Sequence, residues 1–167
     1  MPSGPKLARA MVDVLDPKAN DIVVELGPGT GAFTRQLIAD GVAQENLVLV
    51  ELDPHFARFL RRQFPSATVV EDSAANLPHI LGALGHRKVK RIVSGLPLRS
   101  MSARDRKGVT RAVGGCLERG GVLVQFSYFH LPPLPERFSE RFGLMRRRAG
   151  IVLSNVPPAV VWRYTKT

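Results

Sequence analysis

A glycine-rich turn near residue 30 constrains the fold of this chain more than any other feature. An apolar run over residues 22–26 leads into the turn, which reads Gly-Pro-Gly-Thr-Gly over residues 27–31. A helical spacing of apolar residues follows over residues 32–39. Open α/β sheets place such a turn at the carboxyl end of a strand, where glycines let a ligand approach the backbone and helix N–H groups face an anion. The turn therefore predicts a ligand site at one edge of a parallel sheet.

The rest of the chain repeats this alternation of strand and helix, which is typical of a parallel sheet with helices on its faces. Strands are predicted over residues 22–26, 47–51, 68–70, 89–94 and 121–126, and helices over 5–15, 32–39, 54–64, 77–84 and 102–117. Two final strands, near 144–153 and 159–164, are joined by a link at 155–158 that is too short for a crossover helix, so they should pair antiparallel. We therefore predict a doubly wound, Rossmann-like α/β fold with seven strands, mostly parallel, and an antiparallel last strand.

Length and composition predict one soluble domain. The 167 residues suit a single domain over residues 1–167, with residues 1–19 as an N-terminal helix near the ligand site. No apolar run approaches the roughly 18 residues of a membrane span, and the start lacks a signal-peptide pattern, so we expect a cytoplasmic protein. Cys116 is the only cysteine, and the four histidines lack metal-ligand spacing. The sequence therefore predicts no disulfide and no metal site.

The charge of the chain favours an anionic partner. Its 24 Lys and Arg residues outnumber its 14 Asp and Glu residues, which gives a net charge of +10. This charge attracts nucleic acid and anionic membranes, although an ordinary solvated basic surface has the same composition. A basic cluster over residues 86–91 is interpreted as a solvated loop before a strand. The longest basic run alternates with apolar residues and suits a membrane interface equally well as a solvated face; its members are Arg137, Phe138, Arg141, Phe142, Leu144, Arg146, Arg147 and Arg148.

Two classes of cofactor use a glycine turn of this kind. A nicotinamide dinucleotide would use Gly27, Gly29 and Ala32, whereas S-adenosylmethionine would use Gly27, Gly29 and Gly31 with an acidic residue two positions earlier. An acid at residue 51, after the second strand, suits ribose hydroxyls in both cases. The acid at residue 72, just past the third strand, suits an adenine amino group, and no second domain is present to bring a hydride acceptor. These features favour the methyl donor over the dinucleotide.

The segment from Glu25 to Gly31, together with Glu51 and Asp72, resembles the core of the class I S-adenosylmethionine-dependent methyltransferases. The resemblance implies that S-adenosylmethionine is the methyl donor and S-adenosylhomocysteine the product. It also implies a set of donor contacts, which are Ser3, Glu25, Gly27, Pro28, Gly29, Thr30, Gly31, Glu51, Leu52, Asp72, Ser73 and Ser94.

The loop after the fourth strand bears on the methyl acceptor. Enzymes that methylate base amino groups have a sequence similar to Asn-Leu-Pro-aromatic in this loop. Its polar residue binds the amino group, and its aromatic residue stacks on the base. In this chain Gly95 replaces the polar residue and Leu98 replaces the aromatic. Base capture depends on stacking and on hydrogen bonds to base edges, so these replacements count against a base as the acceptor.

Four further segments are similar to the soluble bacterial phospholipid N-methyltransferases, which convert phosphatidylethanolamine to phosphatidylcholine. These segments are residues 3–8, 94–98, 125–130 and 155–164, and the last carries the most specific pattern, Asn-x-Pro-Pro-Ala-x-x-Trp-x-Tyr. Those enzymes carry a basic amphipathic segment before Ser-Gly, whereas two residues precede Ser3 here. The resemblance implies methylation of phosphatidylethanolamine and its methylated intermediates at the inner face of an anionic membrane. The oligomeric state stays open, and a monomer is favoured.

The implied reaction is an in-line displacement in which the enzyme mainly aligns the reactants. The acceptor contacts would be Gly95, Leu96, Pro97, Leu98 and Tyr128. We expect the ring of Tyr128 to lie beside the amine cation, and His130 to be one candidate for receiving its proton. Two other functions stay open: an enzyme like the ribosomal RNA adenine N6-dimethyltransferases, and a non-catalytic basic domain that binds nucleic acid or membrane.

Overall fold

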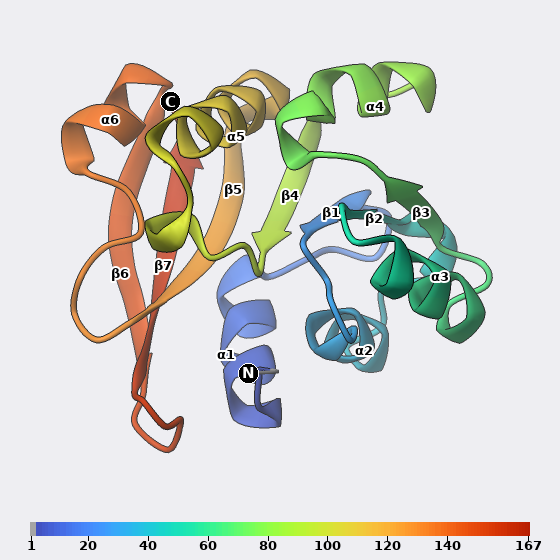
Figure 1. Cartoon of the computed structure of the whole chain (residues 1–167), viewed down its shortest axis with the longest axis horizontal. Coiled ribbons are helices and arrows are strands. Elements are labelled where there is room, and N and C mark those ends of the chain that lie inside the picture. Colours follow the sequence, from blue (N-terminus) through green and yellow to red (C-terminus); the bar gives the residue numbers. More distant parts are fainter. Residues whose placement is uncertain (1–2) are drawn as a thin grey trace.

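The computed structural model describes residues 3–167, which form a seven-stranded sheet with helices on both faces (Figure 1). The strands are β1 Val23–Leu26, β2 Leu47–Glu51, β3 Thr68–Glu71, β4 Val89–Ser94, β5 Leu117–Tyr128, β6 Leu144–Val152 and β7 Ala159–Lys166. The helices are α1 Pro5–Leu15, α2 Ala32–Ala39, α3 Pro54–Gln63, α4 Leu77–Ala83, α5 Ala103–Cys116 and α6 Glu136–Arg141. Three short 3-10 helices connect them: η1 Gln44–Asn46, η2 Ala74–Asn76 and η3 Leu98–Ser100.

The order of the strands confirms the predicted fold. They lie in the order β3-β2-β1-β4-β5-β7-β6, and β7 is antiparallel to both of its neighbours, whereas the pairs from β3 to β5 are parallel. Every residue of β1 and β2 is buried. This burial is what a parallel sheet covered on both faces requires.

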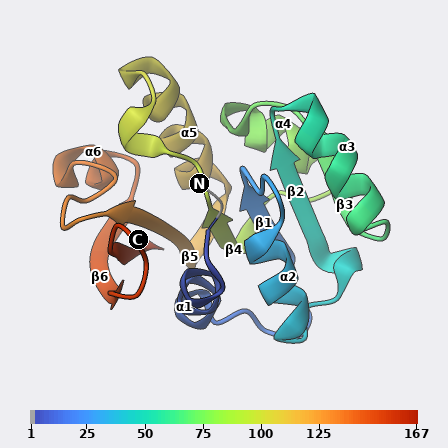
Figure 2. The same cartoon turned by 60° about the horizontal axis from the view of Figure 1, so that its bottom comes forward.

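Two apolar cores lie on opposite faces of the sheet. One contains side chains of α4 and α5, and the other contains side chains of α1, α2 and α3. Figure 2 shows the strands between the α4–α5 pair and the α1–α2 pair. Helix α1 begins with a proline in its first turn and buries one stripe, which consists of Leu7, Ala8, Met11, Val12 and Leu15. It therefore fixes the N-terminal segment against the sheet, next to the glycine turn.

Two elements differ from the sequence prediction. Strand β5 begins at Leu117, directly after α5, because Leu117 pairs with Val89 before the register shifts to the Arg91–Val122 pair. Helix α6 was not predicted. It divides the basic run into a short helix and the edge strand β6, and the interleaved apolar residues Phe138 and Leu144 pack into the core.

The basic run is therefore not one surface. Arg137 and Arg141 lie on α6, at the opposite end of the molecule from the β6–β7 turn (Figure 1). Arg146 lies over the ring of Trp162, with its guanidinium carbon 5.5 Å from the ring centroid. Of the three arginines of β6, Arg147 and Arg148 are exposed and Arg146 is partly buried. Within residues 3–167, no helix has the length and apolar character to cross a membrane, and no cluster of His, Cys, Asp and Glu could hold a metal ion.

Candidate functional site

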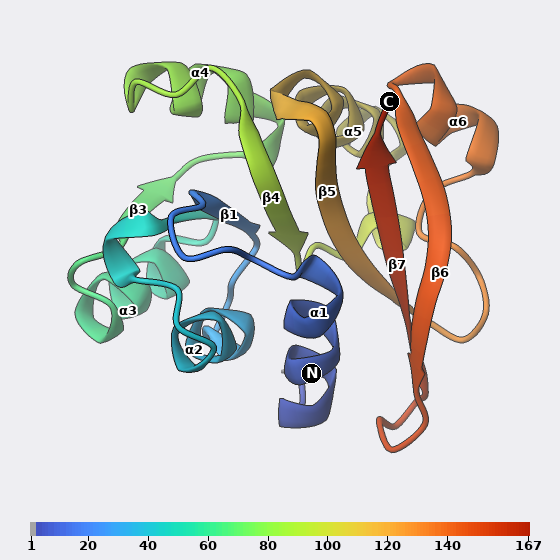
Figure 3. The ribbon, with the colours of Figure 1, turned by 180° about the vertical axis from the view of Figure 1, so that it is seen from behind.

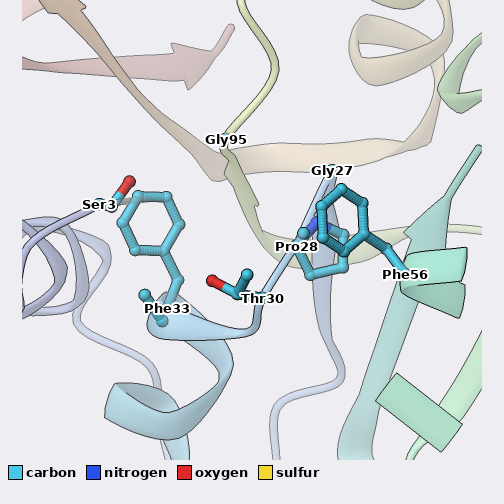
Figure 4. A pocket seen from close by; sticks show the side chains of 9 residues that line it. Ser3, Gly27, Pro28, Thr30, Phe33, Phe56 and Gly95 are labelled. Carbon is cyan, nitrogen blue, oxygen red and sulfur yellow. The ribbon is translucent and has the colours of Figure 1, made fainter. Parts of the chain in front are cut away.

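The carboxyl ends of β1, β2 and β4 meet at one edge of the sheet, where the glycine turn borders a cavity of about 350 Å³ (Figure 4). Its lining comes from the N-terminal segment, the glycine turn, α2, α3 and the loop after β4. The lining residues are Ser3, Gly27, Pro28, Gly29, Thr30, Ala32, Phe33, Phe56 and Gly95. Five of them are predicted donor contacts, and the aromatic rings of Phe33 and Phe56 are additional. We call this space the donor cavity.

The glycine turn is shaped by close contacts and left-handed backbone. Gly29 has a φ of 56° and faces open space, so a ligand can lie directly against its backbone. At Gly27, with a φ of 66°, a Cβ atom would lie 2.7 Å from the Cδ2 atom of Leu96. The turn therefore packs tightly against the loop after β4 at Gly27 and is open at Gly29, which lines the donor cavity.

Glu51 fixes the turn from the neighbouring strand. Its Oε1 atom accepts a hydrogen bond of 3.1 Å from the backbone N–H of Gly29, and its Oε2 atom accepts one of 3.0 Å from the backbone N–H of Leu52. Burial raises the pKa of this carboxyl, and the hydrogen bonds from backbone N–H groups oppose that shift. Each oxygen retains a further lone pair, so Glu51 can also accept from the hydroxyls of a ribose.

A separate, smaller hollow of about 80 Å³ lies at Glu51. It is lined by Val50, Glu51, Leu52, Asp72, Ser73, Ala74, Leu96, Met101 and Val109. The Oδ1 atom of Asp72 accepts hydrogen bonds from the Asn76 side chain at 2.8 Å and from the Ser73 backbone N–H at 2.7 Å. The hydrogen bond from Asn76 contributes most to lowering the pKa of Asp72, so its carboxylate stays an acceptor. Apolar walls with a carboxylate at the rim suit a flat adenine ring and its amino group.

Three of the predicted donor contacts do not line these spaces: Glu25, Gly31 and Ser94. Glu25 is fully buried behind the turn, where its Oε1 atom accepts a hydrogen bond of 2.6 Å from the Thr34 hydroxyl. Its Oε2 atom has no hydrogen-bond partner among the described residues. Burial raises the pKa of Glu25 to about 8, so the carboxyl is mostly protonated at neutral pH. Glu25 therefore supports the turn and makes no wall of the cavity.

A second cavity, of about 410 Å³, adjoins the donor cavity at Gly95. Its lining residues are Gly95, Leu96, Pro97, Leu98, Arg99, Ser100, Phe126, Ser127, Tyr128, Phe129, Leu131 and Pro133. We call it the acceptor cavity, because all five predicted acceptor contacts lie in its wall. Gly95 lines both cavities, and a Cβ atom there would lie 3.0 Å from the carbonyl oxygen of Gly27, so the loop after β4 packs closely against the glycine turn where the two cavities meet. His130 is exposed and is not part of the lining.

The loop between the cavities is held by Gln125, a residue of the segment 125–130 whose role sequence reasoning did not predict. The Nε2 atom of this buried side chain donates to the carbonyl oxygens of Leu96, at 2.8 Å, and Phe126, at 3.2 Å. The only signal in the sequence is one polar residue inside the apolar run of β5. Three rings form the adjacent wall: Phe126 makes edge-to-face contacts with Phe33 and Tyr128, at centroid distances of 6.1 and 5.5 Å.

A solved structure shares this fold, and a family model matches the segment that carries the glycine turn. The magnesium protoporphyrin IX methyltransferase ChlM from Synechocystis PCC 6803, solved with bound S-adenosylmethionine, superposes with a TM-score of 0.74 at 11% identity; the match covers 98% of this chain and 79% of that chain. The model of the ribosomal RNA adenine dimethylase family matches residues 3–73. The fold, the glycine turn and the carboxylates at the tips of β2 and β3 define this chain as a class I S-adenosylmethionine-dependent methyltransferase.

Two relatives indicate to which family of methyltransferases this chain belongs. The ornithine lipid N-methyltransferase of Singulisphaera acidiphila is 35% identical over 145 residues, which are 84% of this chain and 74% of that protein. The ribosomal RNA small subunit methyltransferase A of Laribacter hongkongensis is 34% identical over 91 residues, which are 54% of this chain but only 34% of that protein. The chain belongs to the same family as the Singulisphaera acidiphila enzyme.

Proposed function

We propose that this chain N-methylates the amine of a membrane lipid headgroup, with phosphatidylethanolamine and its methylated intermediates as acceptors. The acceptor cavity carries this proposal, because it lies next to the donor cavity, shares Gly95 with it and is walled mainly by apolar and aromatic side chains. Such a wall suits an alkylated amine that gains methyl groups, since aromatic faces attract cations. The relative from Singulisphaera acidiphila supports a lipid nitrogen as the acceptor, and its name indicates ornithine lipid as a second acceptor to test.

The residues around the donor would hold and orient it. S-adenosylmethionine supplies an electrophilic methyl group on a sulfonium sulfur when bound. Gly29 offers backbone that a ligand can approach closely, Glu51 offers acceptors for the ribose hydroxyls, and Asp72 offers an acceptor for the adenine amine. These contacts would hold the donor beside Gly95, where the two cavities meet, and alignment of the reactants can contribute a large part of the rate enhancement in a displacement.

The residues around the acceptor would orient the headgroup and exclude water. Tyr128 and Phe126 present ring surface to the amine, and the exposed guanidinium of Arg99 at the cavity wall can pair with the phosphate of the lipid. An alkylammonium group must lose a proton before it can attack. No Asp or Glu is among the described residues that line this cavity, so the proton would pass to water, to the lipid phosphate or to His130 nearby.

Methylation of an RNA adenine is the second candidate, because the family model and the Laribacter hongkongensis relative both derive from ribosomal RNA methyltransferases. The matched family model ends at residue 73, before the loop that faces the acceptor. In that loop Gly95 offers no polar side chain and Leu98 is buried. The match therefore supports the donor site and gives little support for a base as the acceptor.

A transfer assay with labelled S-adenosylmethionine separates these functions. The protein is incubated with vesicles of phosphatidylethanolamine and phosphatidylglycerol, with vesicles of ornithine lipid and phosphatidylglycerol, and with structured RNA. We expect label in phosphatidylethanolamine, and none with the Glu51→Ala variant as the control for donor binding. Label in ornithine lipid alone would show that ornithine lipid, not phosphatidylethanolamine, is the acceptor, and the proposal of lipid N-methylation would stand. Label in RNA alone would refute the proposal.

A further inference from the structure

Exposed apolar side chains gather at the edge of the sheet where the acceptor cavity lies. Leu153 and Val156, in the turn between β6 and β7, are 77% and 80% exposed, and Phe129 and Leu131, after β5, are 61% and 54% exposed. We call these four residues the apolar rim. The β6–β7 hairpin projects beyond the rest of the molecule as a narrow finger (Figures 1 and 3). Large apolar side chains this exposed, close together, mark a surface that contacts another apolar phase.

The apolar rim is continuous with the mouth of the acceptor cavity. Tyr128 of β5 pairs with Ala159, the first residue of β7, and the backbone N–H of Phe129 donates to the carbonyl oxygen of Pro158 at 3.1 Å. Phe129 and Leu131 themselves line the cavity. The turn at 153–158 therefore begins where the wall of the cavity ends.

Phe129 is held outward by strained backbone. Its φ of 61° lies in the left-handed region, which a bulky residue seldom adopts. Such a conformation persists where its surroundings hold it, and it clusters at functional sites. Here the bond to Pro158 holds one side of the residue, and the Ser127 hydroxyl, which donates to the carbonyl oxygen of Leu131 at 2.6 Å, holds the other. The structure thus presents a large ring to its exterior at a conformational cost.

The charged side chains nearest the apolar rim are basic and come from α1. The hairpin tip, residues 149–160, contains no charged residue, and the five Lys and Arg residues of 142–167 lie toward the other end of β6 and β7. Lys6 and Arg9 are exposed on the first turns of α1, and a Cβ atom on the preceding Gly4 would lie 3.7 Å from the Oδ1 atom of Asn155 in the turn. Exposed basic side chains around apolar ones match an anionic bilayer, where lipid headgroups attract the cations and the interface accepts the apolar groups.

We infer that the apolar rim inserts into the interface of an anionic phospholipid bilayer and so opens the acceptor cavity onto the lipid headgroups. This inference rests on the proposed function. A second copy of the chain is a poorer partner, because a stable interface needs about 800 Å² from each partner, whereas the rim consists of four side chains along a finger and a loop. The bilayer needs no such area, since a few apolar side chains and nearby cations suffice for reversible binding.

Vesicle sedimentation with two variants tests this inference. The variant Leu153→Ser/Val156→Ser changes only the hairpin turn, and Met145→Ser changes a residue of β6 that is 62% exposed but lies at the other end of the strand. With vesicles of phosphatidylglycerol and phosphatidylethanolamine, we expect the turn variant to bind roughly tenfold more weakly than the unmodified protein or worse. The Met145→Ser control should bind like the unmodified protein. Equal binding by all three proteins, or equal losses in both variants, would overturn the inference.

Two further measurements keep the result decisive. Calorimetry with S-adenosylmethionine should give the same affinity for the turn variant as for the unmodified protein, which shows that it is folded. A Leu153→Trp variant should shift its emission to shorter wavelength on the anionic vesicles, and an unshifted emission would overturn the inference even if the serine variant does not fold. Light scattering that finds a dimer dissociated by the turn variant would also overturn it, in favour of a second copy.

The outcome is separable from that of the proposed function. Methylation of a dispersed short-chain aminolipid requires the acceptor cavity but no bilayer. If the protein methylates this lipid but does not bind vesicles, the inference about the apolar rim is refuted and the proposed function is not. Vesicle binding through the turn, without methylation of any aminolipid, would refute the proposed function alone.

Discussion

Replacing Glu25 by glutamine should remove most of the change in stability between about pH 5 and pH 8. Burial raises the pKa of Glu25 from its ordinary value of 4.5 to about 8 in the folded protein. Between these values the folded protein holds a proton that the unfolded chain releases, so stability is fully present below pH 4.5 and is lost as the pH rises toward 8. A difference of 3.5 between the two pKa values corresponds to about 5 kcal/mol at most, because each unit is worth about 1.4 kcal/mol.

The assay is urea unfolding at pH 5.5, 7 and 8.5, followed by the fluorescence of Trp162, the only tryptophan and a buried one. We expect the unmodified protein to lose a few kcal/mol of unfolding free energy across this series, which is a large part of the roughly 5 to 15 kcal/mol of a typical domain. Glutamine keeps the acceptor for the Thr34 hydroxyl and carries no titratable group, so the variant should change far less. Burial also raises the pKa of Glu51, and this contribution is common to both proteins. Parallel losses in the two proteins would refute the assignment to Glu25.

Three other predictions follow from the site. Glu51→Gln and Asp72→Asn should each weaken S-adenosylmethionine binding by about 10- to 100-fold in calorimetry, because each loses a charged hydrogen-bond acceptor; unchanged affinity would contradict their placement. Tyr128→Ala should lower kcat for lipid methylation while the affinity for S-adenosylmethionine stays the same. A fall in donor affinity with unchanged kcat would contradict a role of Tyr128 at the acceptor. Gly31→Ala should cost about 2 kcal/mol in urea unfolding, because its φ is 85° and a Cβ atom would lie 2.8 Å from the Phe64 ring, whereas Gly115→Ala in α5 should be neutral or stabilising; equal effects would refute this difference.

The fold was predictable because its signals are local. Helix α1 has the predicted bounds, since Pro5 suits a first helical turn and the Asp16-Pro17 pair cannot continue a helix. The glycine turn and the carboxylates at the ends of β2 and β3 were predictable for a related reason: the carboxyl ends of parallel strands meet at one edge. Most of the residues that line the donor cavity, and the loop after β4 that lines the acceptor cavity, could therefore be named from the sequence.

The remaining features depend on contacts between distant segments. From the sequence alone, Arg146 belongs to a basic run. The pairing of β6 with β7 places its guanidinium over the ring of Trp162, which the run does not predict. Glu25 has a polar side chain at a strand end, and only the packing of Thr34 against it shows that it points into the core. Gln125 lies in an apolar strand, and its role in holding the loop at Leu96 requires the pairing of β4 with β5. No pattern of residues near these positions in the sequence determines such contacts.

A crystal structure with S-adenosylhomocysteine is the most direct test of the account. We expect the amino-acid portion of this product beside Gly27 and Gly29, the ribose at Glu51, the adenine in the hollow beside Asp72, and the sulfur directed at Gly95. Density for the product outside the donor cavity, or a donor cavity filled by Phe33 or Phe56 with no product bound, would contradict it.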